Sequence, residues 1–182
     1  MPVFDNLFFL GSLEGKVDIE ATGTLGADGT EGYEKRVKGG AEIKINTIPR
    51  GNEERVLKHM ATLLHGIIHA FLDVYMLRRE NKSRFDLNGY TGHGQFWQGI
   101  AYAMETAVSP LLGVSLDLGR ESALWQEIQE AEGERIDASR WSMSVHKNQR
   151  APANIQHHLY QTKIRGGQRH VVVWPARMGI ER

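Results

Sequence analysis

The 182-residue sequence predicts an α+β fold in which a central helix packs on a short sheet. Two segments alternate apolar and polar residues, as half-buried strands do. One long segment is apolar on almost every side, which is typical of a buried helix. Hydrophobic residues make up 41% of the chain, enough to build a core around these elements.

The predicted strands lie at 16–20 and 41–46, where branched apolar residues alternate with polar ones. Glycines punctuate residues 23–32, which we expect to form a polar loop. This loop lacks the Gly-Lys-Ser/Thr sequence of a phosphate-binding loop. A further short strand is expected at 171–174, where β-branched residues cluster before Pro175.

The strongest helix signal covers 53–79, with two acidic residues at its start and two arginines at its end. Its apolar residues cover more than one stripe, which predicts a helix buried on several sides. A second helix is expected at 94–107, with Pro110 following it. A third, acidic helix is expected at 121–132.

Composition excludes several classes of protein. The chain has no cysteine, which excludes disulfide scaffolds, thiol catalysis and every cysteine-containing zinc finger. No window approaches the length of uncharged apolar sequence that a membrane span needs, and the first ten residues make a poor signal peptide. We therefore expect a soluble, intracellular protein of the nucleus or cytoplasm with no membrane association.

Three histidines form a candidate metal site. His65 and His69 are four residues apart in the long helix, so both rings lie on one face and could share one zinc ion. His93 lies between Gly92 and Gly94, and flanking glycines allow the backbone to approach a site closely. Three histidines would leave a fourth zinc position for water, as catalytic sites do. Each histidine could instead be an ordinary core, loop or helix-start residue.

Gly66 stands directly after the first histidine of the pair. Zinc peptidase helices read His-Glu-x-x-His, with the glutamate as general base, and glycine has no side chain that could move a proton. Asp73 and Glu105 are candidates for orienting a ligand histidine from behind. Ordinary surface carboxylates are the alternative for both residues.

Three segments together resemble the SprT-like family, which includes the Spartan proteases. They are Phe-Asp-Asn-Leu-Phe-Phe-Leu-Gly-Ser-Leu at 4–13, Thr-Leu-Leu-His-Gly-Ile-Ile-His-Ala at 62–70 and Gly-His-Gly-Gln-Phe at 92–96. The resemblance implies a small zincin-like domain over 1–118, followed by a helical and basic extension over 119–182. It also implies that His65, His69 and His93 are zinc ligands.

The same resemblance places Gly66 at the position of the family's catalytic glutamate. We therefore expect a zinc-binding domain with lost or impaired peptidase activity that acts in binding or regulation. The alternative is an active zinc metallopeptidase that uses a substitute base, with DNA-associated proteins as its candidate substrates. A third hypothesis is an interaction domain that has also lost the metal.

The charge of the C-terminal segment is the one indication of a partner. Residues 145–182 carry seven basic side chains and one acidic one, a net charge of +6, although the whole chain is neutral. Such a segment could contact a polyanion, and family members that cleave DNA-crosslinked proteins bind DNA. A protein substrate or partner is also expected from the family. The alternative for the segment is a solvated tail.

Overall fold

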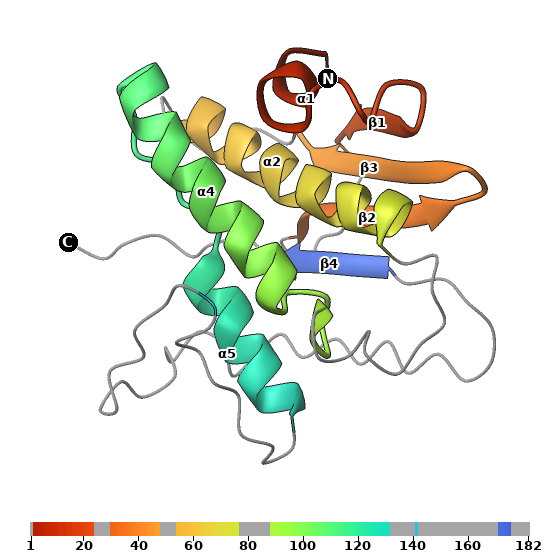
Figure 1. Ribbon diagram of the computed structural model, residues 1–182, viewed down its shortest axis with the longest axis vertical. Helices are drawn as coiled ribbons and strands as arrows, with labels where there is room; N and C mark the ends of the chain where they lie inside the picture. The colour runs from red at the N-terminus through yellow and green to blue at the C-terminus, as the bar shows by residue number, and fades with distance from the viewer. Residues whose placement is uncertain are drawn as a thin grey trace.

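The computed structural model describes residues 2–23, 30–47, 54–76, 88–131, 141 and 171–175. These residues form helices and a mixed sheet, so the predicted α+β class is confirmed. In Figure 1 the helix α2 (Glu54–Tyr75) lies across one face of the sheet, and the helices α4 (Gln95–Leu112) and α5 (Arg120–Glu130) lie to one side of it.

The sheet has four strands in the order β1-β3-β2-β4. The strands are β1 (Val17–Thr22), β2 (Thr30–Val37), β3 (Gly40–Asn46) and β4 (Val171–Pro175). β3 pairs parallel with β1 and antiparallel with β2, and β2 pairs antiparallel with β4 at its other edge. β1, β3 and β4 confirm the predicted strands.

β2 corrects the sequence analysis, which had no strand here and expected a loop up to residue 32. Four of its eight residues are charged, so its own sequence carries a weak strand signal. Pairing with β3 on one side and β4 on the other compensates for this weak propensity, because the backbone N–H and C=O groups on both edges of β2 form hydrogen bonds. The loop prediction is therefore wrong for the residues from Thr30 onward.

The helices position the candidate site. They are α1 (Pro2–Phe9), α2 (Glu54–Tyr75), α4 (Gln95–Leu112) and α5 (Arg120–Glu130). α2 packs on β2 and β3 and is contacted from its other side by α4. Leu64, Ile67 and Ile68 of α2 are fully buried, which confirms the predicted central helix.

Two helix ends differ from the predictions. α2 ends at Tyr75, and the rest of the predicted 53–79 helix lies outside the described residues apart from Met76. α4 continues past 107 and through Pro110 to Leu112. Pro110 lacks the N–H for one intrahelical hydrogen bond, but it does not end the helix, which ends at Gly113, where φ is +67°.

The core continues beyond residue 118. Leu118 and Ala123 belong to the same buried cluster as the residues of α2 and β3. α5 therefore shares a core with α2 and β3. The domain boundary expected at 118 stays a prediction. Within the described residues, none of the helices has the length and apolar content needed to cross a bilayer.

Candidate metal centre

The three predicted histidines meet at one point. His65 and His69 project from adjacent turns of α2, and His93 lies two residues before the start of α4. All three side chains are buried, with exposed fractions of 6%, 4% and 2% respectively. The Nε2 atom of each ring faces the other two.

The spacing of these nitrogens is uniform. The His65–His93 and His69–His93 Nε2 distances are both 3.1 Å, and the His65–His69 distance is 3.2 Å. Zinc–nitrogen bonds of 2.0–2.1 Å in a tetrahedron would place the nitrogens about 3.3 Å apart. The triangle of nitrogens therefore fits a metal ion with three histidine ligands.

Hydrogen bonding fixes the tautomer of His65. Its Nδ1 lies 2.9 Å from the carbonyl oxygen of Leu118. A carbonyl oxygen only accepts, so Nδ1 carries the hydrogen and donates it. In the neutral ring, Nε2 is then left with a lone pair that faces the other histidines.

His93 has the same tautomer for a different reason. Its Nδ1 lies 2.8 Å from the Thr91 hydroxyl, which donates its own hydrogen to Oε1 of Glu127 at 2.5 Å. Because that hydrogen is committed, the Thr91 oxygen accepts from Nδ1 of His93. Nε2 of His93 therefore also presents a lone pair to the centre.

The consequence is a contact that two neutral histidines cannot satisfy alone. The lone pairs of His65 and His93 meet at 3.1 Å, where no hydrogen lies between them. Protonation does not relieve the contact readily, because burial lowers the pKa of His65 to about 4 and lowers the pKa values of His69 and His93 well below the ordinary 6.5. These three residues can hold a metal ion.

Trp97 supports the centre from α4. Its side chain is fully buried. Its ring centroid lies 4.6 Å from that of His65, 4.8 Å from that of His93 and 5.7 Å from that of His69. The indole thus restricts the orientation of all three rings and keeps an apolar surface beside the ligand atoms.

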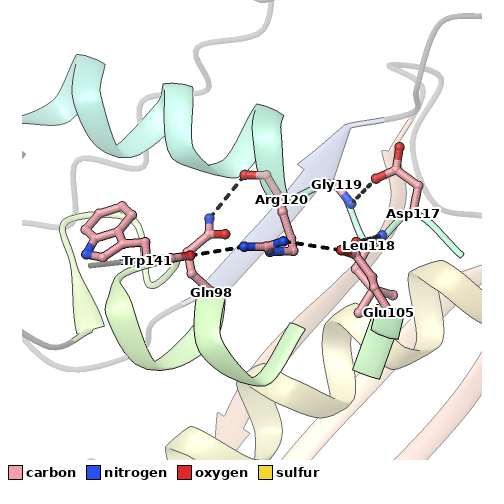
Figure 2. A network of polar contacts seen from close by, with 7 residues as sticks. All are labelled: Gln98, Glu105, Asp117, Leu118, Gly119, Arg120 and Trp141. Atoms are coloured by element: carbon pink, nitrogen blue, oxygen red, sulfur yellow. Dashed lines mark hydrogen bonds and ion pairs between the residues drawn. The ribbon is translucent and has the colours of Figure 1, made fainter. Parts of the chain in front are cut away.

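The carbonyl that binds His65 is itself held in place, as Figure 2 shows. The N–H of Leu118 donates to Oε1 of Glu105 at 2.7 Å, and Arg120 lies 3.6 Å from the other carboxylate oxygen. Arg120 also donates to the Trp141 carbonyl at 3.0 Å. Glu105 therefore supports His65 through Leu118. Burial is the main cause that raises the pKa of Glu105, although its bond to Leu118 opposes this.

Asp73 follows His69 by one turn of α2 and interacts electrostatically with Glu34 of β2. Its side chain is 7% exposed, and its charge adds to burial in raising the pKa of Glu34 on β2 to about 9. The expectation that Asp73 orients a ligand histidine stays a prediction. Gly66 is buried in α2 between the two histidine turns.

Sequence reasoning missed three groups behind the ligands: Thr91, the Leu118 carbonyl and Glu127. A backbone carbonyl carries no sequence signal, and Thr91 is separated from His93 by one residue in an irregular loop. Glu127 lies 34 residues beyond His93, in a helix that was predicted without a role. Only the fold brings these groups behind the imidazoles.

Comparisons with known proteins add no identification. No family model matches the chain. No curated protein and no solved structure matches it either. The site therefore rests on its own geometry, which is compatible with a small zincin-like domain, and the SprT-like resemblance stays a prediction from the motifs.

Proposed function

We propose that this chain is a zinc-binding domain of SprT-like type whose peptidase activity is lost or impaired and which acts in binding or regulation. The single observation that carries the proposal is the meeting of the His65 and His93 lone pairs at 3.1 Å. A cation between them converts a repulsive contact into two bonds. His69 supplies the third nitrogen at matching distances.

Zinc is the ion that this donor set favours. Imidazole nitrogen suits zinc, and three histidines are an established set for a site that keeps a fourth position. When bound, zinc supplies a Lewis acid that can polarise a carbonyl group. The protein's own contribution is to hold three neutral rings with their Nε2 atoms inward and to exclude water behind them through Trp97.

Two carboxylates that act behind the ligands, Glu105 and Glu127, support the proposal of impaired catalysis. Glu105 holds the Leu118 N–H and faces Arg120. Glu127 accepts hydrogen bonds from the loop that carries His93. Both act behind the rings, on the Nδ1 side, whereas a general base has to reach the Nε2 side, where substrate would lie. Gly66 offers no group in their place.

The test of impaired catalysis is Gly66→Glu. General acid–base catalysis contributes about 10² to 10⁴ in rate. We expect the wild type to cleave a protein substrate, with or without DNA, slowly or not at all, and the variant to gain activity on this scale. The zinc content of both proteins is measured in parallel. A variant that binds zinc but stays inactive would show that Gly66 alone does not account for the loss.

A wild type that already cleaves at a substantial rate would favour the alternative, an active zinc metallopeptidase with a substitute base. Changing Asp73 to asparagine in that protein would then ask whether this carboxylate is the base. His93→Ala serves as the control, because metal-dependent cleavage has to disappear with the metal ligand.

Partners and location form the last part of the proposal. The +6 charge of residues 145–182 supports contact with DNA, and the absence of cysteine fits a reducing nucleus or cytoplasm. Deleting 145–182 would also remove β4 from the sheet, so the test replaces the basic residues of the segment, all of which lie outside β4, by glutamine. This should weaken DNA binding and flatten its dependence on salt. Unchanged binding after the replacement would exclude the charge of the segment as the contact. A protein partner in place of a substrate fits the same proposal.

A further inference from the structure

A single carboxylate organises the loop that carries the third ligand. Glu127 of α5 is fully buried. Its Oε1 accepts from the backbone N–H groups of Thr91 and His93, both at 2.8 Å, and from the Thr91 hydroxyl at 2.5 Å. Its Oε2 accepts from the N–H of Tyr90 at 2.5 Å. Four donors from one short loop thus converge on one side chain.

The loop is shaped to admit this carboxylate. Gly89 has φ +75°, and a Cβ atom there would lie 2.4 Å from Oε2 of Glu127. Gly94 closes the loop, because its N–H donates to the Asn88 carbonyl at 2.8 Å and a Cβ there would lie 2.3 Å from the Gly89 nitrogen. Neither position accepts a side chain without displacing the carboxylate or the backbone.

The charge of Glu127 also points to the centre. Among the ion pairs of the described residues, none joins Glu127 to a basic side chain. A chain of hydrogen bonds connects Glu127 to the centre. It runs from the carboxylate through the Thr91 hydroxyl to Nδ1 of His93, whose Nε2 faces the other two histidines. Carboxylates that act through a ligand histidine fix its tautomer and raise its basicity.

We infer that Glu127 is a positioning residue of the metal centre, an inference that rests on the proposed function. It folds the 89–93 loop around itself and, through Thr91, keeps the hydrogen of His93 on Nδ1 so that the Nε2 lone pair points inward. α5, which lies beyond the predicted 1–118 domain, is therefore part of the centre. A purely structural latch on the loop is the competing explanation.

The experiment measures the affinity of the full-length chain for Zn²⁺ and Co²⁺, and the visible spectrum of the cobalt form. Glu127→Gln removes the charge with little change in size, and Glu130→Gln is the matched control, since Glu130 is exposed on the same helix. Thr91→Val removes the hydroxyl, and Thr91→Ser restores it. Loss of a group behind a metal ligand typically lowers metal affinity about 10- to 100-fold. We expect a loss of this size for both Glu127→Gln and Thr91→Val.

We expect Glu130→Gln and Thr91→Ser to keep wild-type affinity and spectrum, while Thr91→Val shifts the cobalt spectrum. Thr91→Val keeps the test valid if Glu127→Gln does not fold. Wild-type affinity and spectrum in both Thr91→Val and folded Glu127→Gln would overturn the inference and leave the proposed function standing. A wild type that binds neither metal would contradict the proposed function itself.

Discussion

Residues of α2 belong to two buried polar clusters. In each cluster like groups lie close together away from water, and the two clusters relieve this repulsion in different ways. Toward α4, three imidazoles bring their Nε2 atoms to within 3.1–3.2 Å of one another. Toward the sheet, Glu34 and Asp73 bring two carboxyl groups into mutual influence, and the pKa of Glu34 rises to about 9, chiefly through burial. The raised pKa favours the neutral, protonated form of Glu34 at pH 7, and the lowered pKa values of the histidines favour neutral rings with a single hydrogen each.

The difference explains why the histidine cluster is the one suited to hold a metal ion. A buried carboxylate can relieve repulsion by binding a proton, which also lowers its cost of burial. His65 and His93 have already committed their Nδ1 hydrogens to Leu118 and Thr91. A second proton on either ring would create a buried cation, whereas a metal ion would bind both Nε2 lone pairs.

The largest expected effect that separates the clusters is on stability in acid. With metal absent, burial keeps the histidines neutral in the folded chain, while the unfolded chain binds protons below pH 6.5. Stability is therefore lost as pH falls from 6.5 toward 4. Each such histidine adds a slope approaching about 1.4 kcal/mol per pH unit. Urea unfolding at pH 7.5, 6 and 5, with a chelator present to remove metal, measures this loss of stability. A free energy of unfolding that does not change with pH would contradict the claim that the buried histidines are neutral.

Removal of the metal is expected to have the next largest effect. Under the proposed function, zinc binds only the folded chain, because the fold brings the three histidines together, so free zinc at 1,000 times Kd should stabilise it by about 4 kcal/mol. Thermal unfolding with zinc and with chelator gives this difference. His93→Ala is the control, and it should show almost no response to zinc. An equal response in that variant would place the metal elsewhere.

The smallest effect is expected at the carboxylate cluster. The pKa of Glu34 is raised in the folded state, so stability is lost as pH rises from 4.5 toward 9. Glu34→Gln removes this dependence and should add about 1 to 2 kcal/mol at pH 8, since burying the amide offsets part of the gain. Glu20→Gln, on the exposed face of β1, is the control. Equal pH profiles for the wild type and Glu34→Gln would show that Glu34 is not held protonated.

The sequence was informative where chemistry follows from local spacing. The four-residue interval between His65 and His69 places both on one helix face, and the apolar character of α2 predicts its central position. The position of His93 followed from its glycine-flanked motif. The strand β2 could not be predicted from the sequence, because its charged residues give a weak strand signal and its pairing with β3 and β4 is a property of the fold. Two of the groups behind the ligands, Glu127 and the Leu118 carbonyl, make contacts 34 and 53 residues apart in sequence.

Asp73 illustrates the limit of spacing arguments. It follows His69 by four residues, which suggested a place behind the metal ligands. That place stays a prediction, and the charge of Asp73 also contributes to raising the pKa of Glu34 on the sheet. Glu105, which the sequence treated in the same way, does support a ligand, but through the Leu118 backbone. Helical spacing indicates which residues share a face, and only the packing of neighbouring elements decides what they contact.

The most direct test of the account is the zinc content of the purified, tag-free chain, measured by elemental analysis beside His93→Ala and His59→Ala. His59 lies on α2 outside the cluster, so it controls for the loss of a histidine. The account predicts about one zinc per chain in the wild type and in His59→Ala, and none in His93→Ala. A wild type that holds no zinc even after reconstitution would contradict the metal centre and leave only its scaffold.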